Sequence, residues 1–209
     1  IASTSEVYGK GIRSPFQEDD DSVLGSTARS RWSYAASKMV DEFLALAYLK
    51  ETGLPVVIFR LFNTVGPRQS GQYGMVVPRF VRWAIEGEPI MVYGDGQQQR
   101  CFGNVIDVVK AIHLLSEAPG AVGQVFNIGS SEEVTIQQLA ERVRERAGSR
   151  SEIKLIPYDE AYEAGFEDFR RRVPALGKIK AVVQWEPTTP LNDTIDQIIA
   201  YQREEKQHG

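Results

Sequence analysis

The stretch PVVIFRLF, residues 55–62, is a nearly continuous run of β-branched and aromatic side chains. Such a run is typical of a parallel strand that is covered on both faces, because both of its faces must then be apolar. The residues before it, from Tyr34 to about Thr52, have the periodicity of a helix, and Gly53 is a suitable C-terminal stop. A helix that leads into a buried strand indicates α/β layering.

Strands and helices continue to alternate on either side of this run. Further strands are expected in IASTSEVYG (1–9), GQVFNIG (123–129) and EIKLIPY (152–158), and further helices over 76–87, 107–118 and 135–147 and on both sides of WEPTTP (185–190). Asp95-Gly96 is a hairpin signal between two strand-like segments. Asp107 is a suitable N-cap for the helix that follows it.

The helix that begins near Tyr34 has two distinct faces. Val40, Phe43, Leu44 and Ala47 recur at the spacing of a stripe that a core would bury. Tyr34 and Lys38 share a face roughly opposite that stripe, since a helix turns by about 100° per residue. The periodicity therefore predicts that these two side chains lie on the surface or in a cleft.

The composition excludes several classes of protein. The chain has 209 residues and a net charge of −4 without a basic block, which argues against a nucleic-acid-binding protein. No apolar run approaches the length of about 20 residues that a membrane span needs, and no signal peptide opens the chain. The single cysteine, Cys101, cannot form an internal disulfide and fits a reducing compartment. We therefore predict a cytoplasmic protein with no membrane or nucleic-acid partner.

Several blocks occur in a fixed order along nearly the whole chain. They are STSEVYG (3–9), YAASK (34–38), RLFNTVGPR (60–68), VYGDGQQQRCF (92–102) with Asp107 downstream, and RRVP (171–174) followed by WEP (185–187). A single Tyr-x-x-x-Lys would be weak, but five blocks with this spacing are specific. Together they resemble the extended short-chain dehydrogenase/reductase superfamily, the NAD-dependent nucleotide-sugar epimerases, dehydratases and decarboxylases.

The resemblance implies the C-terminal part of a Rossmann-like, doubly wound parallel sheet, interleaved with a smaller α/β substrate-binding lobe. Residues 1–66 and 104–130 would form the remaining half of the NAD-binding domain, and residues 67–103 and 131–209 the sugar-nucleotide-binding lobe. The Gly-rich turn that receives the dinucleotide pyrophosphate in such folds does not occur in this sequence. Residue 1 would fall near the fifth strand of the family's sheet, so we expect the C-terminal part of a longer enzyme.

Tyr34 and Lys38 form the candidate acid/base pair. They are four residues apart and so share one helix face. A free tyrosine, with a pKa of about 10, is a poor base at neutral pH, and a nearby ammonium favours the phenolate. The resemblance implies that Tyr34 is the acid/base and that Lys38 lowers its pKa and binds the nicotinamide ribose of NAD. The alternative is an ordinary tyrosine and lysine that face solvent.

The segment Thr4-Ser5-Glu6 carries the remaining candidate catalytic residues. By resemblance, Thr4 relays a proton at the sugar C4 oxygen, although it could equally bond to the backbone at the strand end. Ser5 and Glu6 are the discriminating pair, because TSE resembles decarboxylases and 4,6-dehydratases more than many epimerases. Glu6 is either an acid/base beside the sugar or a carboxylate that accepts loop hydrogen bonds, and the residues leave both open.

Three further residues match substrate-binding positions of the family. Asn63 would bind the diphosphate or the sugar, with a simple Asn turn as the alternative. Arg100 would hold the nucleotide diphosphate, for which a planar guanidinium is suited, or would be an exposed strand arginine. Arg172 aligns with a substrate-binding arginine of the decarboxylases, although the run RRR (170–172) leaves its register open. No metal site is predicted, because neither histidine has a cluster of ligands around it.

The expected function is an NAD-dependent modification of a nucleotide-diphosphate sugar through a 4-keto intermediate. A UDP-sugar 4-epimerase or a UDP-glucuronate decarboxylase is favoured, with a 4,6-dehydratase as the alternative. A hypothesis of another class is a catalytically silent sugar-nucleotide-binding fragment. The resemblance further implies a homodimer of the full-length form, to which the stripe of Val40, Phe43, Leu44 and Ala47 could contribute if it were not buried within the domain.

Overall fold

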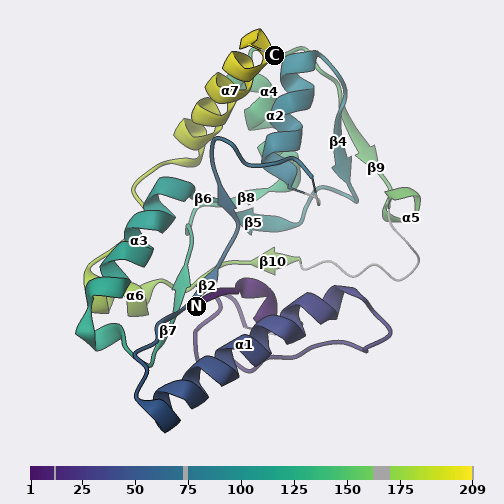
Figure 1. Cartoon of the computed structure of the whole chain (residues 1–209). Coiled ribbons are helices and arrows are strands. Elements are labelled where there is room, and N and C mark those ends of the chain that lie inside the picture. Colours follow the sequence, from purple (N-terminus) through teal and green to yellow (C-terminus); the bar gives the residue numbers. More distant parts are fainter. Residues whose placement is uncertain (12, 73–74, 162–169, 209) are drawn as a thin grey trace.

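The computed structural model describes residues 1–11, 13–72, 75–161 and 170–208 and has a mixed α/β architecture (Figure 1). Its helices are η1 (Ser5–Tyr8), α1 (Arg31–Thr52), α2 (Val76–Glu86), α3 (Val105–Glu117), η2 (Pro119–Ala121), α4 (Ile136–Arg146), α5 (Tyr158–Ala161), α6 (Gly177–Val183) and α7 (Leu191–His208). Its strands are β1 (Ala2–Thr4), β2 (Ile58–Leu61), β3 (Thr64–Val65), β4 (Ile90–Tyr93), β5 (Gln99–Cys101), β6 (Gly103–Asn104), β7 (Val125–Ile128), β8 (Glu133–Thr135), β9 (Ile153–Ile156) and β10 (Arg171–Arg172).

The lower part of the molecule in Figure 1 is a parallel sheet in the order β1-β2-β7. Helix α1 covers one face, where Ala45 packs with Val56 and Ile58. Helices α3 and α6 cover the other face, in a cluster that includes Phe126 and Ile179. The prediction of a parallel strand in PVVIFRLF that is covered on both faces is confirmed. Helix α6 joins this core, although the predicted boundaries assign its residues to the substrate lobe.

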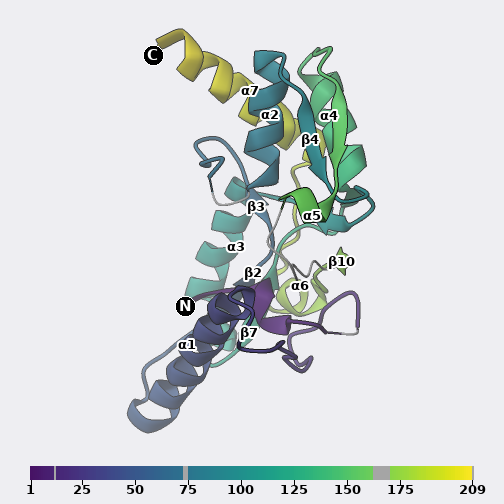
Figure 2. The ribbon, with the colours of Figure 1, turned by 90° about the vertical axis from the view of Figure 1, so that its right-hand side faces the viewer.

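The upper part has a second core between α2, α4, α7 and the parallel pair β4-β9 (Figures 1 and 2). The helices predicted over 76–87 and 135–147 are present as α2 and α4. Thr135 caps α4 in a capping box with Gln138. The short pair β3-β6 and the sheet β10-β5-β8 lie between the two parts of the molecule.

The hairpin predicted at Asp95-Gly96 is wrong. Strand β4 pairs with β9, whereas β5 pairs with β8 and β10, so the two segments belong to different sheets. Gly94 and Gly96 both have positive φ, +75° and +69°, which glycine adopts without strain. The turn therefore carries the chain from one sheet to the other instead of folding it back on itself.

The stripe predicted to be buried on α1 is also wrong. Val40, Phe43 and Leu44 are 54%, 69% and 52% exposed, and Ala47 is exposed as well. The face that packs against the lower sheet contains instead the buried residues Trp32, Ala35, Glu42 and Ala45. The covered face contains a charged residue, Glu42, and is therefore less apolar in sequence than the opposite side of the helix. Apolar periodicity for this reason predicts the wrong face.

Asp107 does not cap α3. The N-cap is Asn104, whose Oδ1 accepts a hydrogen bond from the amide of Ile106 at 2.8 Å. Asp107 lies in the first turn, 2% exposed, and accepts hydrogen bonds from Thr188 and Thr189. The carboxylate therefore joins α3 to the segment that leads into α7, rather than satisfying the amides of its own helix.

Strand β10 resolves the register of the three consecutive arginines. It runs parallel to β5, with Arg171 beside Gln99 and Arg172 beside Arg100. The backbone directly after it is held by Phe16, whose amide donates to the carbonyl of Val173 at 2.8 Å. This pairing directs Arg172 toward the segment where β1 ends.

Candidate functional site

The candidate site begins where β1 passes into η1. Thr4 is the last residue of β1, and its Oγ1 accepts a hydrogen bond from the amide of Glu6 at 3.2 Å. Thr4 and Ser5 are both buried, at 8% and 4% exposed. The hydroxyl of Thr4 therefore serves as the cap of η1, which is the backbone-bonded arrangement that the sequence left open.

Glu6 lies between two arginines from distant parts of the chain. Arg172 Nη1 donates to Glu6 Oε1 and also to Ser5 Oγ at 3.4 Å, while Arg31 Nη2 lies 3.3 Å from Glu6 Oε2. One carboxylate thus draws together η1, the first turn of α1 and β10. Glu6, Ser5 and Arg172, predicted separately from sequence, are in contact.

Arg31 was missed by the sequence analysis. It is three residues before Tyr34, so both project from neighbouring positions on one helix face. Its side chain is 22% exposed in the ion pair with Glu6. The signal that could have found it is the spacing alone, a cation one turn before a candidate acid/base.

Arg100 is buried next to Arg172. It is 7% exposed, so the alternative of an exposed strand arginine is wrong. Register partners on parallel strands point to the same side of the sheet, and Arg100 and Arg172 are such partners. Arg100 Nη1 donates to the carbonyl of Gln99 at 2.8 Å. Arg100 and Arg172 therefore project from adjacent positions on the same side of this sheet.

Asn63 follows β2 and connects it to the β5–β6 segment. Its Nδ2 donates to the carbonyl of Cys101 at 3.0 Å, and its own carbonyl accepts from the amide of Gly103 at 2.8 Å. Asn63 is thus placed at the junction of the two parts of the molecule. Cys101 is fully buried, and burial raises the pKa of its thiol to about 12.

Tyr34 and Lys38 lie at the edge of the packed face of α1. At about 100° per residue, Lys38 is about 40° from the buried Glu42, and Tyr34 is about 20° from the buried Ala45. Tyr34 is 54% exposed, and Lys38 Nζ donates to Asp41 Oδ2 at 2.7 Å. Helix α1 packs on both β1 and η1, the two elements that meet at Thr4.

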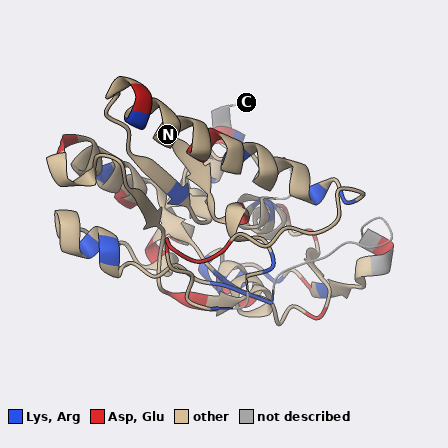
Figure 3. Ribbon diagram, turned by 90° about the horizontal axis from the view of Figure 1, so that it is seen from below, with Lys and Arg blue, Asp and Glu red and all other residues tan. Residues whose placement is uncertain are grey.

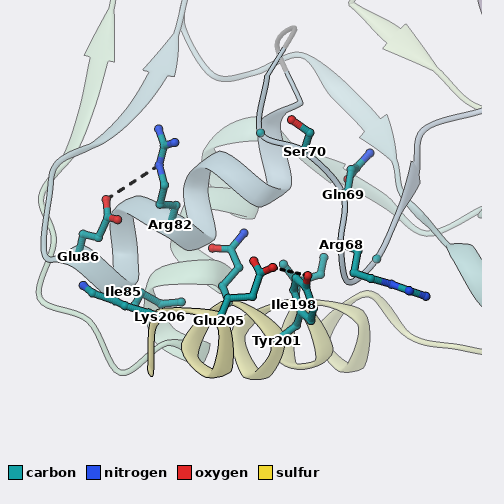
Figure 4. Close-up of a pocket in the computed structure, with 13 residues that line it drawn as sticks. Arg68, Gln69, Ser70, Arg82, Ile85, Glu86, Ile198, Tyr201, Glu205 and Lys206 are labelled. Atoms are coloured by element: carbon teal, nitrogen blue, oxygen red, sulfur yellow. Dashed lines mark hydrogen bonds and ion pairs between the residues drawn. The ribbon is translucent and has the colours of Figure 1, made fainter. Parts of the chain in front are cut away.

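A groove of about 470 Å³ occurs elsewhere, between the 66–71 loop, α2 and α7 (Figure 4). It carries Arg68, Arg82 and Lys206 together with Glu86 and Glu205, and their charges alternate rather than converge. The predicted site residues, all of which the structure describes, lie outside this groove.

Charge is interspersed over the rest of the molecule, with acidic and basic residues alternating among the elements (Figure 3). Within the described ranges, no three histidine, cysteine, aspartate or glutamate residues are grouped as they would be around a metal ion. In that same part of the chain, no helix combines the length and the apolar character needed to cross a membrane.

Comparison with known proteins gives consistent matches over nearly the whole chain. The model of the GDP-mannose 4,6 dehydratase family matches residues 1–198. The UDP-N-acetyl-alpha-D-glucosaminuronate decarboxylase of Bacillus cytotoxicus is 43% identical over 206 residues, which are 98% of this chain and 63% of the relative.

Two solved structures have the same fold over 98% and 99% of this chain. The UDP-glucose 4-epimerase of Thermotoga maritima, solved with UDP-glucose, superposes with a TM-score of 0.85 at 29% identity and is covered over 63% of its length. The dTDP-glucose 4,6-dehydratase of Bacillus anthracis, solved with NAD, gives 0.82 at 28% identity and 61% of its length. The chain thus spans somewhat less than two thirds of these proteins.

Proposed function

The chain belongs to the GDP-mannose 4,6 dehydratase family, and from this membership we propose that it forms part of an NAD-dependent enzyme that modifies a UDP-sugar through a 4-keto intermediate. The predicted α/β fold is confirmed by the structural matches, which include an NAD complex and a UDP-glucose complex. The sites and the reaction are the proposal. The cofactor domain would be 1–66 with 104–130, and the sugar-nucleotide lobe 67–103 with 131–209, except that α6 of the latter range packs on the cofactor-domain sheet.

The residues at the edge of α1 suit the nicotinamide end of NAD. Bound NAD would take up the hydride from C4 of the sugar. Tyr34 is accessible there and would remove the proton of the C4 hydroxyl, with Lys38 favouring its phenolate. Thr4 would orient that hydroxyl from the end of β1. Asn63 and Arg100 would bind the sugar diphosphate.

Decarboxylation is the outcome that we favour, and the pairing of Glu6 with Arg31 and Arg172 is the observation that carries it. Two guanidiniums on one carboxylate leave excess positive charge, which favours a substrate with its own carboxylate. Once C4 is a ketone, the C6 carboxylate lies β to it. The C5–C6 bond can then break, with carbon dioxide leaving and the electron pair passing to the enolate.

The pairing also bears on the role of Glu6. Both carboxylate oxygens of Glu6 face an arginine, Oε1 the guanidinium of Arg172 and Oε2 that of Arg31, so neither oxygen is directed only at the substrate. Glu6 would therefore orient Arg31 and Arg172 for the sugar carboxylate rather than act as the acid/base at C5. The homology to a uronate decarboxylase supports the same substrate class.

The test uses the product of the complete reading frame, supplied with NAD and with UDP-glucuronate or UDP-N-acetylglucosaminuronate. We expect loss of 44 mass units, one carbon dioxide, in the sugar nucleotide followed by mass spectrometry. A product of unchanged mass with inverted C4 would identify a 4-epimerase instead. Tyr34→Phe should remove most turnover and leave sugar-nucleotide binding intact, whereas Tyr48→Phe, an exposed tyrosine of the same helix, should change neither.

A binding protein without catalysis is the alternative from another class. It would apply to these 209 residues as a separate chain, whose sequence contains no Gly-rich pyrophosphate turn. Isothermal titration of the 209-residue chain with UDP and with NAD separates the two interpretations. The alternative would be favoured if the chain bound UDP but not NAD and if the product of the complete reading frame showed no turnover.

The exposed stripe on α1 supports the proposal of a homodimer. Val40, Phe43 and Leu44 form a contiguous apolar face of the kind that marks an interface. Phe43→Glu should convert a dimer to a monomer in light scattering. Val109→Glu, at an exposed apolar position of α3, should not. We also propose a cytoplasmic location, for which the single reduced cysteine is the support.

A further inference from the structure

A buried ion pair lies between α1 and the lower sheet and includes none of the candidate site residues. Arg60 of β2 donates to both oxygens of Glu42, from Nε at 3.0 Å and from Nη2 at 2.8 Å. Ser3 of β1 donates its hydroxyl to the same carboxylate. Ser3, Glu42 and Arg60 are 4%, 6% and 8% exposed, so water replaces none of these contacts.

The pair is part of a larger polar network under the candidate site. The guanidinium of Arg60 lies over the ring of Tyr8, 4.7 Å from its centroid, and Nη1 donates to the carbonyl of Glu18 at 3.1 Å. The Tyr8 hydroxyl donates to Asn127 Oδ1 at 2.6 Å. The network thus connects α1, β1, β2, η1 and β7 through directional bonds.

Stability alone does not account for such a pair. Burying two charges costs desolvation that their attraction only roughly offsets, and well-packed apolar residues of similar volume are often as stabilising or more so. What a bidentate pair supplies in addition is orientation, because the flat guanidinium and carboxylate must stay in one plane. A helix held through apolar contacts alone can turn or slide by small amounts.

The orientation that this pair fixes is that of the helix bearing Tyr34 and Lys38. At about 100° per residue, Glu42 projects about 40° from Lys38 and about 80° from Tyr34. Its partners Ser3 and Arg60 lie on β1 and β2 at register positions opposite each other, and Thr4 is the next residue after Ser3. The rotation of α1 is thereby set directly against the strand that presents Thr4.

We propose that Glu42 and Arg60 are positioning residues that set the rotation of α1, so that Tyr34 and Lys38 face Thr4 and the sugar C4. The inference rests on the proposed function, because it assigns the pair to the same acid/base. Tyr34, Lys38 and Glu42 lie in one line along α1, four residues apart. Glu42 acts through the helix backbone rather than on the substrate.

The decisive variant is the apolar double substitution Glu42→Leu/Arg60→Met in the product of the complete reading frame. We expect the melting temperature to stay level or to rise, as for other buried pairs replaced by apolar residues. We expect kcat to fall by about a hundredfold, the usual effect of a small misplacement of a reacting group, with KM for the UDP-sugar within threefold.

A second readout needs neither turnover nor cofactor. With 3-fluorotyrosine incorporated, the fluorine signal of position 34 is identified by its loss in Tyr34→Phe. We expect this signal to shift or broaden in the double variant as α1 samples several rotations. The matched control is Glu86→Leu/Arg82→Met, a surface Arg–Glu pair on α2 with atoms 4.0 Å apart, which should change neither signal nor kcat.

The outcomes separate the positioning role of Glu42 and Arg60 from the proposed function. A folded double variant with wild-type kcat and an unchanged fluorine signal overturns the positioning role while the proposed function stands. If the double variant does not fold, it is replaced by Arg60→Lys, which keeps the charge and loses the bidentate geometry. An unchanged kcat and an unchanged fluorine signal in Arg60→Lys would then overturn the positioning role. If the wild type converts neither sugar, the proposed function fails, and the fluorine signal alone decides the positioning.

Discussion

The carboxylate of Asp107 connects the start of α3 to the segment before α7, and its removal should weaken the whole fold. It accepts hydrogen bonds from the amide of Thr188 at 3.0 Å, the hydroxyl of Thr188 at 3.1 Å and the amide of Thr189 at 2.8 Å. A hydrogen bond to a charged group contributes about 1.5–3 kcal/mol. Because Thr188 is exposed, water replaces part of this, and we expect Asp107→Ala to lower the free energy of unfolding by about 3 kcal/mol.

Urea denaturation followed by tryptophan fluorescence measures this loss. In a chain of 209 residues it corresponds to a decrease in Tm of about 6–12 °C. Glu117→Ala, an exposed carboxylate at the other end of α3, is the matched control and should stay within about 0.5 kcal/mol of the wild type. A loss below about 1 kcal/mol for Asp107→Ala would refute the reasoning, because three charge-assisted bonds could not then be intact in solution.

The pH dependence gives an independent check with Asp107→Asn. Burial acts to raise the pKa of Asp107, but the hydrogen bonds from Thr189 and Thr188 outweigh it, and the pKa lies below its usual value. A carboxyl with a depressed folded pKa stabilises the protein above its unfolded pKa of about 3.9, and this stabilisation is lost as the pH falls through the folded value. The difference between wild type and Asp107→Asn should be full at pH 7 and shrink below about pH 4. A constant difference would contradict this account.

The remaining predictions concern the rest of the chain. Cys101, with its pKa raised to about 12 by burial, should not react with a disulfide reagent at pH 8 until urea unfolds the protein, and rapid labelling of the native state would show that it is accessible. Thr135→Ala removes the cap of α4 and should cost about 1 kcal/mol in urea denaturation, with Thr135→Ser restoring most of it. Hydrogen bonds from arginines lower the pKa of Glu133 and Asp196, and for Glu132 such a bond from Arg142 outweighs burial. Stability should therefore fall as the pH drops below about 4.5, and an acid titration by circular dichroism that is flat to pH 3 would argue against these pairs.

The elements that sequence predicted well are those whose neighbours are local or apolar. The strand in PVVIFRLF could be identified because every side chain in it prefers a covered site, and its two covering layers are present. The helix predicted over 135–147 is present as α4, which begins after its cap Thr135. Ser5, Glu6 and Arg172 were recognised as site residues from family blocks, and the structure brings these three into contact.

The incorrect predictions concern residues whose environment is set by partners far away in the sequence. The buried face of α1 contains Glu42, whose charge is matched by Arg60 of β2, and no local pattern reveals such a partner. The apolar stripe with Phe43 is exposed in the described chain. Periodicity therefore identifies an apolar face of the helix, but it does not show whether that face packs within the domain. Asp107 has the composition of a cap but bonds to residues about eighty positions later. Arg31 lacked any local signal beyond its spacing.

The three arginines before Val173 make the charge pattern of β10 degenerate. If the strand slipped by one residue, Arg171 would replace Arg172 opposite Glu6, and Arg170 would replace Arg171 opposite Glu133, so an alignment that matches charges alone would accept either frame. The frame is chosen instead by an uncharged residue, since Val173 is 5% exposed and its carbonyl accepts the amide of Phe16. Anyone who transfers residue roles across this family should therefore anchor the segment on the valine and proline, and count the arginines backward from there.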